Sequence, residues 1–275
     1  MKLYKNILML CTILVLNSCT KSIPVENNFE PQIFIHGILV DGINKITVKI
    51  QQTVAVTELE LNPINDASVT LYTKDPSGIE SILSNSFTIN NGEYTTTETV
   101  TAIIGHSYWI EVVLKDGTEF RSDQEILKPN IPVKKITMDS NFTRIIFNDP
   151  EQDINFYLLH YAFYENDNFI YDTWELTNDV LFNGNVNAYY EIADVGGDSV
   201  FASIQNLNFN TYQFYLNSFA QYENQIGNSA EDTDPGQLFL PPPAHLHGNI
   251  RNITKDTKAL GFFGVFSYEF KITKF

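Results

Sequence analysis

The feature that most constrains this chain is a short-range alternation of apolar and polar residues that recurs from residue 32 onward. In Lys45–Gln51 and again in Ala67–Thr73, every second side chain is apolar. An extended strand places such residues on one face, ready to be buried. Turn signals separate the runs, among them Asp41-Gly42 and Asn90-Asn91-Gly92. Short strands with turns at this spacing predict an all-β protein built as a sandwich.

Two prolines in Lys128–Pro132 interrupt the pattern, because proline cannot continue a central strand. We place a domain boundary there, with a β-sandwich over 31–128 and a second β-rich, sandwich-like domain over 129–275. In the second domain we expect strands at Val133–Met138, Arg144–Phe147, Asn155–Tyr164, Ser199–Ile204, Tyr212–Tyr222 and Gly261–Ile272. The stretch Thr211–Gln225 is long enough for a helix, but its Tyr and Phe content favours a strand.

The N-terminus has the pattern of a bacterial lipoprotein signal. Lys2 and Lys5 precede the apolar run Ile7–Leu16, which is shorter than the ~20 residues of a membrane-spanning helix. Leu16-Asn17-Ser18-Cys19 then resembles a lipobox, although Asn17 departs from the small residue usual at that position. We expect a signal peptide over 1–18, a lipid anchor on Cys19 and a polar tether over 19–30. The alternative is an ordinary secretory signal with an incidental cysteine.

Charge and cysteine content narrow the functional classes. The formal net charge is -16, and no part of the chain supplies the basic patch that a phosphate backbone needs, so nucleic acid is not an expected partner. The two cysteines are Cys11, inside the signal, and Cys19. The processed chain therefore has no thiol for a disulfide, a thiolate metal site or cysteine catalysis.

A long irregular segment, 225–248, is the first candidate for a contact surface, because long loops in compact domains are often functional. It contains Pro242 within a run of three prolines, and His245 and His247 two residues apart. Such a histidine pair suits a metal, but no third ligand is apparent, so we interpret them as loop histidines. Tyr212 and Tyr222 precede the loop and are candidate contact residues, since exposed tyrosines favour binding surfaces.

Enzymatic signatures are absent from the sequence. No GxSxG, Walker or GxGxxG motif occurs, and Asp149, Glu151 and Asp153 lack the glycine and the final glutamate of a calcium loop. Acids are abundant enough that a carboxylate pair for hydrolysis stays open as an alternative. We expect a non-enzyme without cofactor or metal.

An ordered set of segments spans nearly the whole processed chain: a lipobox, Gly37–Asp41, Ala67–Leu71, Gly92–Tyr94, Lys115–Ser122, Gly248–Ile250 and Leu260–Val265. In this order they resemble a Bacteroidota outer-membrane lipoprotein family, domain-of-unknown-function family 4249. The resemblance implies an immunoglobulin-like first domain and no established catalytic residues. Asn249, Gly261, Phe262 and Phe263 match its tail motif, which we interpret as structural, although Asn249 is kept as a candidate contact residue.

The resemblance also implies a place in the cell. Such proteins are often encoded beside TonB-dependent outer-membrane receptors, which suggests an accessory role in nutrient uptake at the outer membrane, on its cell-surface side. Asp198-Ser199-Val200 has the form of an O-glycosylation acceptor of that phylum, with Ser199 as the acceptor. The alternatives are a structural or adhesive surface lipoprotein, and a hydrolase whose carboxylates carry no motif.

Overall fold

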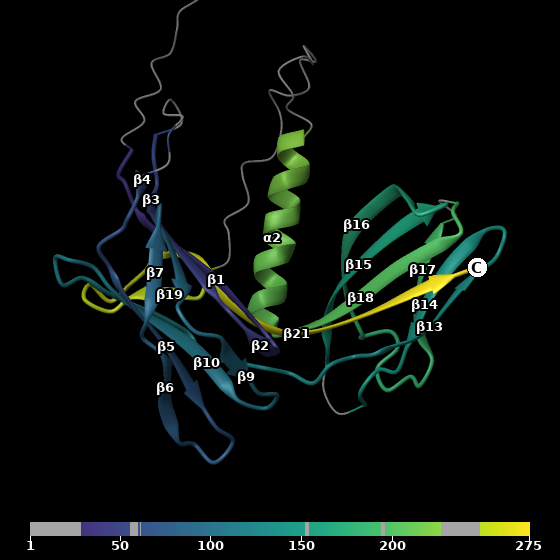
Figure 1. Cartoon of the computed structure of the whole chain (residues 1–275), viewed down its shortest axis with the longest axis horizontal. Coiled ribbons are helices and arrows are strands. Elements are labelled where there is room, and N and C mark those ends of the chain that lie inside the picture. The colour runs from purple at the N-terminus through teal and green to yellow at the C-terminus, as the bar shows by residue number, and fades with distance from the viewer. Residues whose placement is uncertain (1–28, 56–59, 61, 152–153, 194–195, 227–247) are drawn as a thin grey trace, which may run out of the picture. The chain divides into compact units, whose positions relative to one another are not determined.

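The computed structural model describes residues 29–55, 60, 62–151, 154–193, 196–226 and 248–275 (Figure 1). It confirms the all-β prediction. The described strands form sandwich-like pairs of sheets, and the described residues contain one helix, α2 (Phe209–Ile226). Contacts group residues 31–275 into one compact unit.

The first sandwich packs two sheets around one apolar core. One sheet contains β1 (Ile33–Val40), β3 (Thr47–Gln52), β8 (Glu93–Thr96) and β7 (Phe87–Asn90), with β4 (Asn62–Pro63) beside β3. The facing sheet contains β6 (Glu80–Ser84), β5 (Ser68–Lys74), β10 (Ser107–Val113), β11 (Glu119–Ser122), β19 (Ile250–Asn252) and β20 (Thr257–Lys258), with β12 (Glu125–Ile126) beside β10. A short ribbon of β2 (Gly42–Asn44) and β9 (Val100–Ala102) completes it. The predicted alternation holds, because Val48 and Ile50 are fully buried in this core.

The second sandwich is built in the same way around a core rich in aromatic residues. Its larger sheet contains β16 (Asn168–Asn178), β15 (Phe156–Glu165), β18 (Ser199–Leu207) and part of β21 (Leu260–Lys274). Its smaller sheet contains β13 (Val133–Met138), β14 (Phe142–Phe147) and β17 (Ala188–Ala193). Tyr157, Phe163 and Phe147 lie fully buried between them.

The strand β21 belongs to both sandwiches. Its first half pairs in parallel with β1, from Phe34 opposite Leu260 to Val40 opposite Phe266. Its second half pairs in antiparallel fashion with β18, where Ser267 lies opposite Asn206. Figure 1 shows it as the yellow strand that runs from β1 to β18. Residues 250–266 therefore contribute strands to the first sandwich, which differs from the expected assignment of all of 129–275 to the second domain.

Close contact between β1 and β21 depends on Gly261. Its φ is +111°, a region that favours glycine, and a Cβ built there would lie 1.8 Å from the carbonyl oxygen of Ile35. Two residues on, the Phe263 side chain is fully buried in the first core. The structural interpretation of the tail motif is thus supported by where these two residues lie.

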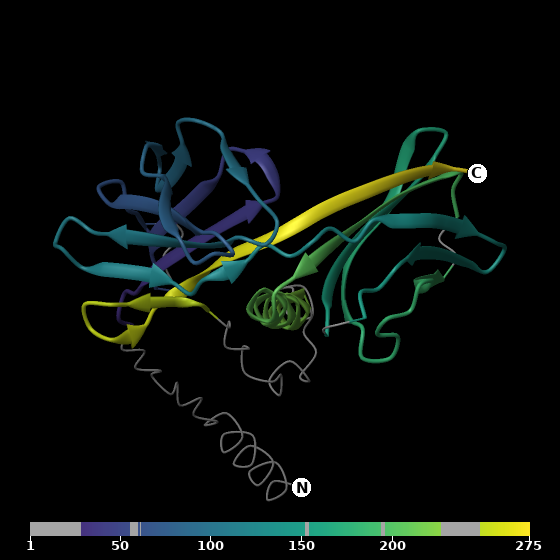
Figure 2. The same ribbon diagram turned by 90° about the horizontal axis from the view of Figure 1, so that it is seen from below.

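The prediction of a strand over Thr211–Gln225 is wrong, because this segment lies within α2. Tyr212, Tyr215 and Phe219 recur at helical spacing and pack on a third apolar cluster, against the face of the large sheet that points away from the two sandwich cores. Phe214 stacks on Phe262 of β21 with 4.6 Å between ring centroids. Figure 2 shows the helix end-on beside β21. Burial of this aromatic stripe outweighs the weak β preference of the same residues.

Candidate contact surface

A row of five aromatic rings crosses the second sandwich on the same outer sheet face as α2. We call Trp174, His160, Phe201, Phe270 and Tyr268 the aromatic row. They lie on β16, β15, β18 and β21, one strand after another. Successive ring centroids are 4.1, 5.3, 5.7 and 6.0 Å apart, which is within the range of favourable aromatic pairs.

Strand register explains why these side chains share one face. His160 lies directly opposite both Trp174 and Ser203, and Phe270 lies opposite Ser203 from the other side. Since side chains alternate across a strand, the neighbours Leu159 and Tyr161 point into the second core instead. The sequence therefore splits the aromatic residues of β15 between a buried face and an open one.

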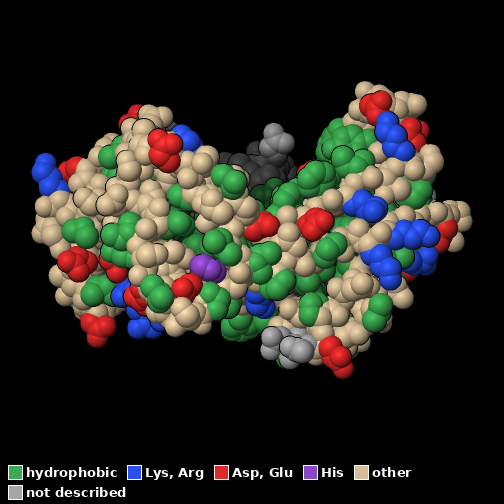
Figure 3. All heavy atoms as spheres, turned by 60° about the horizontal axis from the view of Figure 1, so that its bottom comes forward, with side chains coloured by type: hydrophobic (Ala, Val, Ile, Leu, Met, Phe, Trp, Pro, Cys, Tyr) green, Lys and Arg blue, Asp and Glu red, His purple; other side chains and the backbone are tan. Residues whose placement is uncertain are grey.

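Two members of the aromatic row are exposed to solvent, and the other three are half-buried between and beside them. Trp174 is 42% exposed and Phe270 55%, and beside them Ile272 is 59% exposed. On the face seen in Figure 3, hydrophobic side chains likewise reach the surface at many places among polar ones. Several exposed apolar side chains on one sheet face, rather than a single exposed residue, favour an interaction site.

One carboxylate is held against the row. His160 Nε2 lies 3.2 Å from Asp172 Oδ2, and the His160 ring stacks on Trp174 with an interplanar angle of 4°. This contact fixes the ring orientation and leaves a negatively charged group beside the aromatic surface. The row can therefore bind apolar groups, with a positive charge favoured at the Asp172 end.

The contact residues expected from sequence differ in their exposure, and several of them lie outside the described residues. Tyr222 is 63% exposed on α2, whereas Tyr212 packs on Phe156, 4.8 Å between centroids. Pro242, His245 and His247, like Cys19, lie outside the described residues. Neither of the two tyrosines belongs to the aromatic row, which sequence reasoning did not assemble.

Two further expectations are corrected by burial. Asn249 is 3% exposed, so in this structure it is an internal residue and not a contact residue. Ser199 is 4% exposed at the start of β18, which speaks against it as an O-glycosylation acceptor in the folded chain. A modifying enzyme needs an accessible hydroxyl, and the strand pairing with Lys274 and Tyr164 places Ser199 inside the sheet.

A buried carboxyl group joins the first sandwich to α2. Glu125 Oε1 accepts hydrogen bonds from Asn210 Nδ2 at 3.0 Å and from Asn249 Nδ2 at 3.1 Å. Burial raises the pKa of Glu125 to about 6, and these amide donors offset part of that effect. The arrangement is internal, since Glu125 is buried, and it connects two parts of the fold.

The acidic turn at 149–153 is also a structural element where it is described. Burial raises the pKa of Asp149, whose Oδ1 accepts a hydrogen bond from the Tyr157 hydroxyl. Its Oδ2 accepts one from the Gly184 N–H at 2.8 Å. Asp149 therefore ties β15 to the turn at Gly184, while Asp153 lies outside the described residues.

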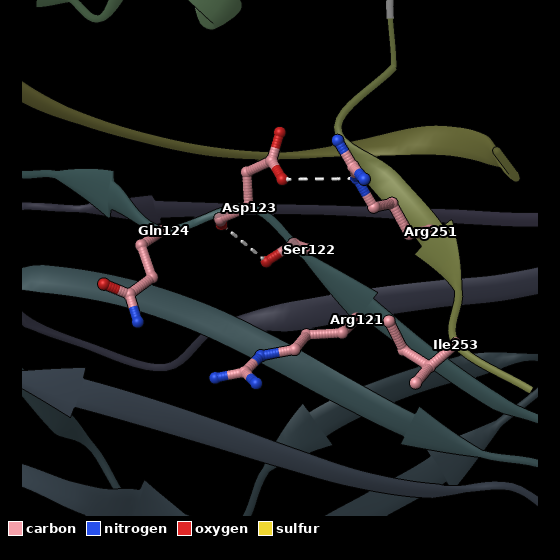
Figure 4. A pocket seen from close by; sticks show the side chains of 6 residues that line it. All are labelled: Arg121, Ser122, Asp123, Gln124, Arg251 and Ile253. Carbon is pink, nitrogen blue, oxygen red and sulfur yellow. Dashed lines mark hydrogen bonds and ion pairs between the residues drawn. The ribbon is translucent and has the colours of Figure 1, made fainter. Parts of the chain in front are cut away.

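A shallow hollow of about 270 Å³ lies where β11 meets β19 (Figure 4). Arg121 and Arg251 are directly opposite each other in the register. Each has a carboxylate partner: Arg121 Nε lies 3.4 Å from Glu111 and Arg251 Nε 3.8 Å from Asp123. Because both charges are already paired, the hollow has no net preference for an anion.

The described residues contain no group of three or more His, Cys, Asp or Glu side chains placed to hold a metal ion. No helix among them has both the length and the apolar character needed to cross a membrane.

Fold and surface together define an all-β protein of sandwich-like sheets with an exposed aromatic row. The chain belongs to the family described as domain of unknown function (DUF4249), whose model matches residues 20–272. No curated protein matches it.

Solved structures with partial similarity include a DUF4785 family protein from Legionella pneumophila, at 13% identity and a TM-score of 0.28, with 64% of this chain covered. The native conformation of Escherichia coli alpha-2-macroglobulin is similar at 9% identity and a TM-score of 0.24, with 66% of this chain covered. The chain spans 52% of the Legionella chain and 13% of the macroglobulin.

Proposed function

We propose that this protein is a non-enzymatic, lipid-anchored accessory protein of the outer membrane that binds a TonB-dependent nutrient-uptake receptor. The observation that carries the proposal is the aromatic row, an exposed apolar surface on an otherwise acidic chain. Support for the membrane location comes from the lipobox pattern that ends at Cys19. The receptor as partner follows from the family resemblance described above.

Aromatic side chains suit this role because they bury a large area with little loss of conformational freedom. The row stands on four hydrogen-bonded strands, so its rings are held in place before a partner arrives. Such preorganisation reduces the entropy lost on binding. A protein partner that covers Trp174, Phe270 and Ile272 would remove their exposed area from water.

The deciding experiment is a pull-down of the tagged protein from its native membrane in mild detergent, with mass spectrometry of what co-purifies. We expect a TonB-dependent barrel in stoichiometric amount, and its loss from the variant Trp174→Ala/Phe270→Ala. The matched control is Ile82→Ala/Ile89→Ala, which removes two similarly exposed apolar side chains from the first sandwich. If no barrel is recovered with the wild-type protein, the receptor proposal fails.

The anchor is tested separately. We expect Cys19→Ala to move the protein from the membrane fraction to the soluble fraction, because the acyl chains on the cysteine supply the attachment. A variant that stays membrane-bound after cleavage of the signal would remove the main support for a lipoprotein.

A further inference from the structure

We propose that the free edge of β16 is an acceptor for a strand of a partner protein, and that the partner strand is basic and extended. This inference rests on the proposed function in taking the surface beside Trp174 as the contact surface. It goes further because it names the binding mode and the chemistry of the partner.

The edge is long and regular. Among the described strands, β16 pairs with β15 alone and lies at one end of the nine-stranded sheet, as Figure 1 shows. Its register with β15 is unbroken from Tyr171 to Asn178. Alternate backbone N–H and C=O groups of such a strand point away from the sheet and form a ready template for another strand.

The edge also lacks most of the features that normally prevent strand addition. Proteins protect edges with Lys, Pro, bulges or very short strands. β16 contains no Lys, Arg or Pro, and its one register irregularity lies beyond Tyr171, near the hairpin turn. By contrast, the edge strand β13 follows Pro132, contains Lys134 and Lys135, and has an irregular register at Val133/Lys135. The other end of the large sheet, β7, has four residues.

The charges on β16 indicate which kind of strand would pair with its free edge. The charged residues of β16 are Asp172 and Glu175, both acidic, and they lie on opposite faces because their positions differ by an odd number. A lysine-bearing strand would place positive charges opposite both of them. A second copy of this chain, paired antiparallel through the same edge, would bring four carboxylates together without a base, on two chains of formal charge -16. The structure therefore favours a basic partner strand over self-association.

The aromatic row extends the same site. Trp174 lies on β16, so a strand added at this edge continues the open face, and its apolar side chains meet the Trp174 ring. The pairing would thus combine backbone hydrogen bonds for affinity with side-chain contacts for specificity, as in other cases of strand addition.

The test uses the full-length chain in mild detergent and a synthetic peptide of about nine residues, a length matched to the regular part of β16. The peptide carries two lysines three positions apart, so that one can face Asp172 and the other Glu175, and valine or threonine at its other positions. We expect a change in Trp174 fluorescence and slowed hydrogen exchange of the β16 amides. A peptide with glutamate in place of lysine should bind at least ~10-fold more weakly. Asp172→Lys should weaken binding of the lysine peptide by a similar factor, whereas Glu98→Lys, an exposed site between β8 and β9, should not.

Two N-methylated versions of the peptide separate strand addition from side-chain contact. One carries methyl groups on its odd amides and the other on its even amides, so each removes the donors of one peptide edge. Strand addition predicts that one version loses binding and the other keeps it. Equal binding of both versions, exchange protection away from β16, or a chain that dimerises through β16 and ignores the peptide would overturn the proposal.

The two proposals fail in distinguishable ways. Peptide binding at β16 without a co-purifying barrel would retain the strand acceptor and reject the receptor as its partner. A barrel that co-purifies equally well with wild-type protein and Asp172→Lys would retain the accessory function and reject the β16 edge as the contact.

Discussion

The side chain of Asn249 binds the main chain of Phe263 through both of its polar groups. Its Oδ1 accepts a hydrogen bond from the Phe263 N–H and its Nδ2 donates one to the Phe263 carbonyl, each at 2.9 Å. The same Nδ2 donates to Glu125. One buried amide thus connects β21, β12 and the segment before β19.

Asn249→Ala is expected to lower the free energy of unfolding by about 2–4 kcal/mol, because it leaves the Phe263 N–H and carbonyl buried without these partners. Urea denaturation followed by circular dichroism measures the loss. Asn141→Ala, at an exposed turn, is the matched control and should change stability by less than about 0.5 kcal/mol. Equal stability of the two variants would contradict the assigned role.

Glu125→Gln is expected to stabilise the protein at pH 7 and to remove one part of its pH dependence. The folded-state pKa of Glu125 is raised from 4.5 to about 6. Its favourable contribution to the free energy of unfolding is therefore complete below pH 4.5 and is lost as the pH rises through 6. Glutamine keeps an acceptor for Asn210 and Asn249 without the charge. At pH 7 the gain should be about 2 kcal/mol, and at pH 4 it should vanish.

Unfolding free energies of wild type and Glu125→Gln, measured in parallel from pH 4 to pH 8, isolate this group from the other acids. A difference that stays constant over the range would show that Glu125 keeps its ordinary pKa in the folded protein.

Gly261→Ala is expected to cost more than about 3 kcal/mol, since the new Cβ would collide with the backbone of Ile35 and no side chain can move to relieve the clash. Gly78→Ala is the matched control. Gly78 also has a positive φ, +92°, but nothing lies within 4 Å of its Cβ position, so only the conformational cost of about 1–2 kcal/mol remains. Thermal unfolding of both variants distinguishes the steric effect from the conformational one.

The two tryptophans are expected to respond differently to acrylamide. Trp174 is 42% exposed and Trp109 is 1% exposed, so one fraction of the emission should be quenched and the other protected. Trp174→Phe should remove the quenched fraction while it lowers stability by no more than about 1 kcal/mol, because an aromatic ring still stacks on His160. Quenching that persists in this variant would contradict the open face.

Much of the strand pattern was predictable from residues alone, because alternation reports directly which face is buried. Runs such as Ser199–Ile204 and Gly261–Ile272 lie within β18 and β21. The helix α2 was not predicted, since Tyr and Phe prefer strands on average and only packing on Phe262 and its neighbours shows the helical stripe. Local preference is weak where tertiary burial is large.

The aromatic row could not be assembled from sequence. Its members come from four strands, and a shift of one residue in any register would turn that member to the core. The cluster around Glu125 was missed for a related reason. Asn210 and Asn249 are far from Glu125 in the chain, and only the folded topology brings these amides to the carboxyl group.

The shared strand β21 has a consequence for the order of events during synthesis. β1 is the first strand described and β21 the last, and Phe34 of β1 lies opposite Leu260 of β21. The large sheet of neither sandwich can be completed until this final segment has been synthesised. Because pairings between residues far apart in the chain form slowly, we expect the sheet that β21 completes to form only after the whole chain has been made.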